Sequence, residues 1–195
     1  TWSGDVASTW DAMRKQIPVC LNFTLTANPN VHSDISGFLA HDYNTNGWAS
    51  AKDNPQFREL YVRWMQLGAF MTMMRSHGTG APREIYLYGK KGEPVYDALV
   101  DAVKLRYRFL PYIYSHAWQV SKNDDSFMRA LFMDFKNDKN TWDINDEFMF
   151  GRNVLVCPVG RALFTPEEID KSGKFAEVDW NATKTYDVYL PEGIR

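Results

Sequence analysis

A carboxylate lies between two tryptophans close to the start of the chain, in the run Trp2-Ser3-Gly4-Asp5 that Trp10 follows. A carboxyl group that donates a proton near neutral pH needs a raised pKa, and partial burial against apolar rings raises it. The face of an indole ring also suits the stacking of a sugar ring. The types and spacing of these residues therefore indicate a proton donor beside a sugar-stacking surface.

A helix cap is the structural alternative for the same residues. Asp5 or Ser8 would then be the N-cap of a helix that begins near Trp10, because Asp and Ser side chains accept hydrogen bonds from free backbone amides. Taken alone, so short a motif favours the cap. The chemical interpretation depends on what the rest of the chain places beside Asp5.

Asp34 is the next carboxylate at which the chain changes character. Residues 31–35 predict a short strand, and a loop that contains Gly37 and Phe38 follows it directly. The pattern places Asp34 at the end of the strand, where its side chain could line a pocket. A lone Asp-x-x-Gly is also explained by an Asp that caps the loop, and in isolation this role is favoured.

Arg75 and His77 follow a third apolar run. Residues 71–74 predict a buried strand, and in an extended chain the two polar side chains after it point to the same side. In isolation, a structural ion pair or a core histidine accounts for them better than a binding site does. Their chemical interest comes from their place in the order of elements.

Helical patterns alternate with these strands. Residues 10–16 are predicted to be helical, with Pro18 ending the helix, and residues 56–71 and 94–120 carry apolar side chains at the spacing of a buried helix face. Alternating strands and helices predict an α/β fold of the (β/α) barrel type.

The predicted barrel brings the polar residues together. Its active site lies at the carboxyl ends of the strands, which meet at one mouth however far apart they are in the sequence. Asp5, Asp34 and the pair of Arg75 and His77 all stand at such ends. We therefore expect a carboxylate-rich, aromatic mouth formed by these residues.

The chain changes character again after residue 126. Short apolar or alternating runs follow, and each predicts a strand of a small β domain. They lie at 128–135, 148–150, 154–159 and 185–190. We expect two parts, residues 1–126 and residues 127–195, although the run that begins at Met128 could still belong to the first.

The composition is that of a folded protein with little net charge. Lys and Arg number 22 against 24 for Asp and Glu, and a net charge of -2 lacks the basic excess typical of nucleic-acid partners. No run of about 18 apolar residues predicts a membrane span. Cys20 and Cys157 lie in apolar runs and no histidine has a partner at ligand spacing, so we expect no disulfide, metal or cofactor.

A series of short motifs runs along the chain. They are Trp2-Ser-Gly-Asp5-Val6, Asp34-Ile-Ser-Gly-Phe38, Arg63-Trp-Met-Gln-Leu-Gly-Ala-Phe70, Arg75-Ser-His-Gly78, Leu105-Arg-Tyr-Arg-Phe-Leu-Pro-Tyr-Ile-Tyr114, Met128-Arg-Ala-Leu131, Asp146-Glu-Phe-Met-Phe-Gly151 and Val154-Leu-Val-Cys-Pro-Val159. In this order they resemble glycoside hydrolase family 31. Each motif is weak alone, but together they are specific and cover essentially the whole chain.

The resemblance implies a retaining exo-α-glycosidase, built on a (β/α)8 barrel that is followed by C-terminal β domains. Asp5 matches the general acid/base of the family. The substrate is then an oligosaccharide. The positions that match the lining of the first sugar subsite are Trp2, Asp34, Phe38, Arg75 and His77.

The resemblance also implies a catalytic partner that the sequence lacks. The nucleophile of the family lies in a Trp-x-Asp-Met type motif on an earlier strand, and no such motif occurs between Thr1 and Arg195. We therefore expect a fragment, inactive alone, that holds the last part of the barrel and the start of a β-sandwich domain. Because part of a barrel exposes open sheet edges, self-association or pairing with the missing N-terminal half is also expected.

Specificity is suggested by two further runs. Arg75-Ser-His-Gly78 followed by Ala81-Pro-Arg-Glu-Ile85 resembles α-xylosidases that release terminal α-linked xylose from xyloglucan-type oligosaccharides. The alternatives are an α-glucosidase and a non-catalytic carbohydrate-binding or structural fragment. The sequence leaves the compartment open between periplasm, cytoplasm and secretion.

Overall fold

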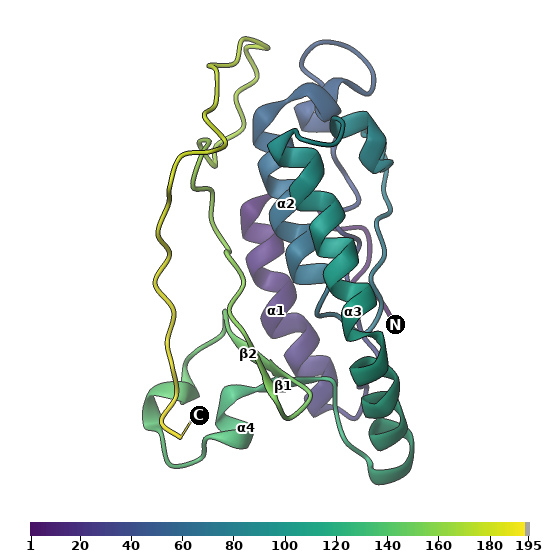
Figure 1. Cartoon of the computed structure of the whole chain (residues 1–195), viewed down its shortest axis with the longest axis vertical. Helices are drawn as coiled ribbons and strands as arrows, with labels where there is room; N and C mark the ends of the chain where they lie inside the picture. Colours follow the sequence, from purple (N-terminus) through teal and green to yellow (C-terminus); the bar gives the residue numbers. More distant parts are fainter. Residues whose placement is uncertain (194–195) are drawn as a thin grey trace.

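The computed structural model describes residues 1–193, and its helices run along the long axis of the molecule (Figure 1). The long helices are α1 (Trp10–Leu25), α2 (Pro55–Gly68) and α3 (Pro94–Asn123). The short ones are α4 (Leu131–Asp134) and the 3-10 helices η1 (His41–Tyr43), η2 (Ser50–Asp53), η3 (Ile85–Tyr88) and η4 (Lys139–Trp142). None of the helices within residues 1–193 has the length and apolar character needed to cross a membrane.

Thr9 starts helix α1. Its side-chain oxygen accepts a hydrogen bond from the Ala12 amide at 3.1 Å, which makes Thr9 the N-cap. The interpretation of Asp5 or Ser8 as the cap is therefore wrong. The helix begins only at Trp10, so a cap at Asp5 would stand too far from the amides that need a partner.

Pro18 lies inside α1 and does not end it, contrary to the prediction. A proline in a helix interior removes one backbone hydrogen bond. Here Ile17, Cys20 and Leu21 are no more than 5% exposed and pack into the core. This burial holds the second half of the helix in place as far as Leu25.

Three extended segments pair side by side and in parallel. They are residues 1–8, 31–40 and 74–80, called the first, second and third segments. The amide of Phe38 donates to Val6 O at 2.8 Å, and the amide of Thr79 donates to Phe38 O at 2.7 Å. A long helix follows each segment, so the chain has the strand and helix order of a partial (β/α)8 barrel. The predicted α/β fold class is confirmed.

The segments meet at single bridges and do not form the regular strands predicted at 31–35 and 71–74. Ser36 and Gly37 both have a φ of +74°, and this left-handed backbone interrupts the second segment. The 71–74 run bends after α2, and the third segment pairs with the second at Ser76.

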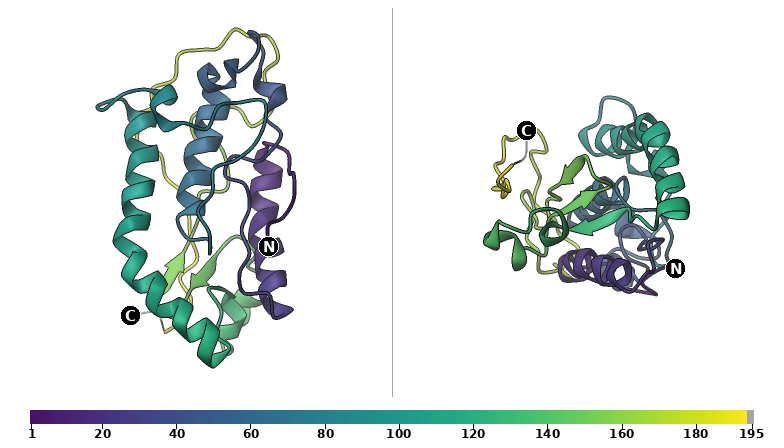
Figure 2. Two further views of the ribbon diagram at one scale, coloured as in Figure 1. Left: turned by 90° about the vertical axis from the view of Figure 1, so that its right-hand side faces the viewer. Right: turned by 90° about the horizontal axis from the view of Figure 1, so that it is seen from below.

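A small antiparallel sheet lies at one end of the helices, beside α1 (Figure 2). Its strands are β1 (Met128–Ala130), β2 (Phe148–Phe150) and β3 (Val154–Val156), in the order β1-β2-β3. The predicted strand at 128–135 stops early because helix α4 begins at Leu131. The strand expected at 185–190 is absent from the described chain, and there the Tyr189 amide donates to Glu147 Oε1 at 2.6 Å.

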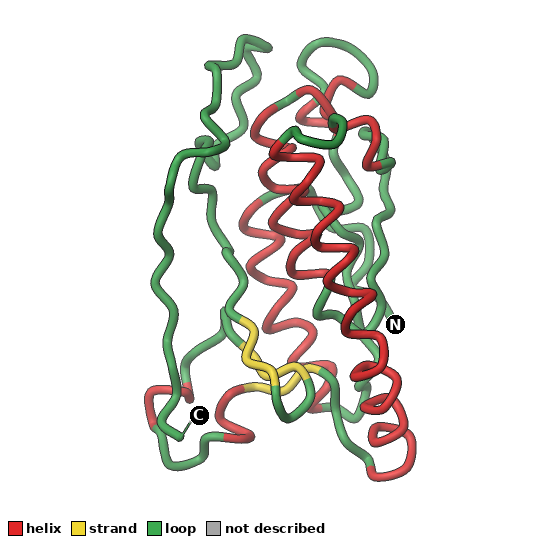
Figure 3. The backbone as a smooth tube through the Cα atoms, in the orientation of Figure 1, coloured by secondary structure: helices red, strands yellow, loops and turns green. Residues whose placement is uncertain are grey.

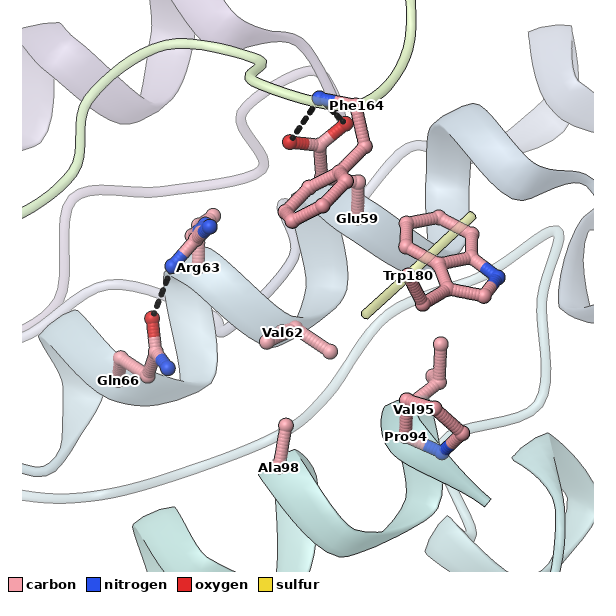
Figure 4. A pocket seen from close by; sticks show the side chains of 9 residues that line it. All are labelled: Glu59, Val62, Arg63, Gln66, Pro94, Val95, Ala98, Phe164 and Trp180. Atoms are coloured by element: carbon pink, nitrogen blue, oxygen red, sulfur yellow. Dashed lines mark hydrogen bonds between the residues drawn. The ribbon is translucent and has the colours of Figure 1, made fainter. Parts of the chain in front are cut away.

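Residues 160–193 form a strap without helix or strand along the outside of the helices (Figure 3). Glu59 on α2 anchors it. The buried carboxylate accepts the amides of Leu163 at 2.6 Å, Phe164 at 3.1 Å and Thr165 at 2.9 Å, and the Thr165 hydroxyl at 2.8 Å. Figure 4 shows the contact of Glu59 with the Phe164 amide, at the rim of a cleft of about 200 Å³ between α2 and the start of α3.

Replacing Glu59 with glutamine tests this anchor. One of the two acceptor oxygens becomes an NH2 group, which faces the strap amides and cannot accept from them. We expect the free energy of unfolding to fall by about 1.5–3 kcal/mol, the range of a hydrogen bond to a charged group. Urea denaturation measures it, with the exposed Glu177→Gln as the control. Equal stability of the two variants would contradict the anchor.

Candidate active site

Asp5 lies in a bend of the first segment. Gly4 precedes it with a φ of +87°, a conformation that glycine adopts without steric cost, and the Val6 amide folds back to Gly4 O at 3.0 Å. The Asp5 side chain is exposed. Residues 1–193 therefore do not supply the partial burial that the sequence led us to expect around it.

The two tryptophans that flank Asp5 in the sequence lie apart. Trp2 is 49% exposed and bridges to His32 in the second segment. Trp10 is only 2% exposed and packs in the core, because it is the first residue of α1 and faces the interior of the fold. The expected pair of indole walls is therefore wrong, because only Trp2 is exposed enough to stack against a sugar.

Asp34 is fully buried at the junction of the second and third segments. Arg75 Nη1 lies 2.9 Å from its Oδ1, and the Ile35 amide donates to Arg75 O at 3.0 Å. The guanidinium N–H is not aligned with the oxygen, and within the described chain neither carboxylate oxygen accepts a hydrogen bond. A buried carboxylate beside a cation, with neither oxygen accepting a hydrogen bond, has unused acceptor capacity.

Of the structural alternatives for these residues, the Asp34 loop cap and the core histidine are not observed, whereas the ion pair is. The Gly37 amide bonds to the backbone carbonyl of Asp34 at 2.9 Å, so the Asp34 side chain does not cap the loop. Arg75 forms its ion pair with Asp34, and His77 is exposed rather than in the core. The structure thus brings together residues from two segments that the sequence separates by about forty positions.

Phe38 and His77 form the second close pair. Their ring centroids are 5.4 Å apart with an interplanar angle of 52°. Phe38 belongs to the second segment and His77 to the third. The pair therefore lies on the same two segments as Asp34 and Arg75, further toward their C-terminal ends. Within residues 1–193, no hydrogen bond or ion pair joins Asp5 to any of these four side chains.

His32 is a neighbour of this group that the sequence did not single out as part of it. The ring is 7% exposed, and its Nε2 has no hydrogen-bond partner in the described part of the chain. Burial lowers the pKa of His32, as do the N-terminal ammonium and Arg75, while Asp34 raises it. The ring is therefore neutral at neutral pH. The bridge between His32 and Trp2 depends on the pairing of two segments that are distant in the sequence, and no local sequence motif indicates it.

A groove of about 730 Å³ opens along the third segment, between that segment and α3. Met73, Tyr107 and Leu110 line it and are substantially exposed, at 52%, 68% and 44%. An exposed apolar face of this kind marks an interaction surface or a ligand-binding groove. Across residues 1–193, no group of three or more His, Cys, Asp or Glu side chains is placed to hold a metal ion.

Comparison with known proteins places the chain in a family. A model of the glycosyl hydrolases family 31 TIM-barrel domain matches residues 1–116, and a model of the family 31 C-terminal domain matches residues 124–194. An α-xylosidase from Saccharolobus solfataricus is 36% identical over 87% of this chain and 22% of its own length. Alpha-glucosidase 2 from Bacillus thermoamyloliquefaciens is 33% identical over 92% of this chain and 20% of its own.

A solved structure gives the same relationship. The α-xylosidase from Xanthomonas citri superposes with a TM-score of 0.75 and 42% sequence identity, over 82% of this chain and 17% of that one. The chain therefore spans about a fifth of the length of the curated relatives it matches.

Proposed function

The chain belongs to glycosyl hydrolase family 31, and from this premise we propose that it is part of a retaining exo-α-glycosidase in which Asp5 is the general acid/base. The observation that carries the proposal is Asp34, a buried carboxylate with two oxygens able to accept, held by Arg75 at the junction of two parallel segments. Hydroxyl groups of a terminal sugar are the ligands that such a group recognises.

Each candidate residue then has a distinct role. Asp5 protonates the leaving oxygen and later takes a proton from the attacking water. Asp34 and His77 bind sugar hydroxyls, and Arg75 holds the Asp34 carboxylate in place. Trp2 and Phe38 supply the aromatic walls of the sugar subsite.

A retaining mechanism needs a second carboxylate about 5–5.5 Å from the first, which attacks the anomeric carbon. Within residues 1–193, neither the strand order nor a sequence motif identifies a second carboxylate that could partner Asp5. We propose that a part of the enzyme outside these 195 residues supplies the nucleophile, since the relatives are about five times as long. The 195-residue chain alone is then inactive.

The exposed groove beside the third segment is the proposed contact with that other part. Its apolar lining includes the exposed side chains of Met73, Tyr107 and Leu110, which the remainder of a closed barrel would cover. Self-association through the same face is the competing proposal for the chain alone.

We also propose that the barrel part ends at residue 126 and the β-sandwich part begins at 127. Asp125 supports a rigid junction there, because its buried carboxylate pairs with Arg129 Nη1 and Arg152 Nε at 2.8 Å each. These contacts tie the end of α3 to β1 and to the turn after β2.

The proposed substrate is terminal α-linked xylose on a xyloglucan-type oligosaccharide. Support comes from the α-xylosidases of Saccharolobus solfataricus and Xanthomonas citri, which are 36% and 42% identical to this chain. An α-glucosidase is the second candidate, because alpha-glucosidase 2 from Bacillus thermoamyloliquefaciens is nearly as similar, at 33%.

Hydrolysis by the complete enzyme tests the proposal. We expect p-nitrophenyl α-xyloside to be cleaved with at least about ten times the kcat/KM of the α-glucoside, since a pocket without room for the extra CH2OH group discriminates by about 1–3 kcal/mol. NMR of the first product should show the α anomer. The reverse preference would favour the α-glucosidase. Sugar binding without turnover of either substrate would favour a non-catalytic module.

A further inference from the structure

Arg83 lies between the two segments that carry the candidate site, and the proposed mechanism gives it no role. Its Nη2 donates to Gly37 O and its Nη1 to Ala81 O, both at 2.9 Å. The guanidinium carbon lies 5.3 Å from the centroid of the Phe57 ring. Two carbonyls and an aromatic face thus fix the plane of the guanidinium.

The backbone of both segments packs closely around this group. A Cβ on Gly78 would meet Arg83 Nη2 and would lie 2.6 Å from Phe38 O. A Cβ on Gly37 would lie 2.6 Å from Ala7 O, and the φ of Gly37 is +74°. The glycines beside Phe38 and His77 therefore leave room for the guanidinium and the neighbouring chain, and a side chain at either position would push the segments apart.

Helix α2 contacts the backbone of Arg83 through Tyr61. The buried Tyr61 hydroxyl donates to Arg83 O at 2.7 Å and is 3.0 Å from Ser76 Oγ. Ser76 stands between Arg75 and His77 in the third segment. The backbone of Arg83 and the middle of the third segment are thus fixed to one point on a rigid helix.

The charge of Arg83 has no local carboxylate partner. No ion pair to Arg83 exists within residues 1–193, and its buried Nε has no hydrogen-bond partner there. Burial lowers the pKa of Arg83, and the nearby Tyr88, Tyr61 and Asp34 act in the opposite direction. A cation so enclosed costs free energy, so a purely packing role would be served better by an apolar side chain.

We propose that Arg83 is a positioning residue that ties the segment of Asp34 and Phe38 to the segment of Arg75 and His77, and so sets the spacing of the Phe38 and His77 rings. This inference rests on the proposed function, because the ring pair matters only if a sugar binds there. Arg83 acts through Gly37 and Gly78 and does not itself touch the substrate.

Kinetics of the complete enzyme test the role. Arg83→Met removes both hydrogen bonds while keeping an apolar side chain, and we expect KM to rise about 10-fold and kcat/KM to fall about 10- to 100-fold. Arg83→Lys keeps the charge but loses the two-pronged contact, so it should fall in between. The control is Arg58→Met, because Arg58 also donates to a backbone carbonyl, that of Tyr88, but within residues 1–193 its side chain forms no hydrogen bond or ion pair with either segment. An unchanged KM in Arg83→Met would overturn the proposal.

Hydrogen exchange in the 195-residue chain tests the same role without any activity. The Thr79 and Ala40 amides, which join the two segments, should exchange at least about 10-fold faster in Arg83→Met than in Arg58→Met, while β2 keeps its protection. Equal exchange in both variants would overturn the positioning role. A complete wild-type enzyme that cleaves neither α-xyloside nor α-glucoside would instead refute the proposed function, so the two failures are distinguishable.

Discussion

Asp5→Ala is expected to lower kcat of the complete enzyme by about 100- to 10,000-fold on an oligosaccharide, because the leaving sugar then departs without a proton and general acid catalysis contributes a factor of this size. Asp5 is exposed in residues 1–193 and takes part in no ion pair there, so its removal should leave the melting temperature unchanged. Steady-state kinetics with a xyloglucan-type oligosaccharide and thermal unfolding measure the two effects.

The leaving group separates a proton donor from a residue that only binds. A p-nitrophenolate leaves without protonation, so the first step with p-nitrophenyl α-xyloside should be slowed much less than with the oligosaccharide. The second step, attack by water, still needs Asp5 as a base. Asp11→Ala is the matched control, because Asp11 is an exposed carboxylate on the first turn of α1 whose partner is Lys15. Equal losses of kcat/KM, which reports the first step, on both substrates would contradict the role of acid.

The order of elements could be predicted from the sequence because it depends on local patterns. The helix positions follow from apolar spacing, and the parallel pairing of the extended segments follows from the alternation of helices and strands. That order is what brings Asp34 and Arg75 together, 2.9 Å apart. The sequence therefore predicts that Asp34 and Arg75, about forty positions apart, lie near each other, but it does not predict that they form an ion pair.

Details that depend on three-dimensional packing were not predictable in this way. Trp10 has the same spacing to Asp5 whether it lines a pocket or the core, and only the direction of α1 sends it inward. The contact of Arg83 with Gly37 O joins residues 46 positions apart, so it does not follow from the local sequence around Arg83. Pro18 predicts a helix end because it removes one backbone hydrogen bond. The burial of its neighbours on α1 stabilises the helix beyond this point.

Asp34→Asn is expected to lower kcat/KM of the complete enzyme by about 10- to 150-fold, which corresponds to about 1.5–3 kcal/mol for the loss of a charged hydrogen bond to a sugar hydroxyl. The asparagine keeps the shape of the side chain. It replaces one acceptor oxygen by a donor and removes the charge that Arg75 faces. The loss should therefore appear in both KM and kcat, because a hydroxyl contact serves the bound substrate and the transition state.

The ion pair with Arg75 offers a second explanation, and a double-mutant cycle separates it from substrate binding. If Asp34 serves only to hold Arg75, then Arg75→Gln and the double variant should be as impaired as Asp34→Asn. If Asp34 binds the sugar directly, Arg75→Gln should cost less, because the carboxylate keeps both oxygens and only its orientation loosens. Both carboxylate oxygens lack an aligned donor in the described chain, and this favours the second result. Equal losses in all three variants would make Asp34 a structural partner of Arg75 and remove it from the sugar subsite.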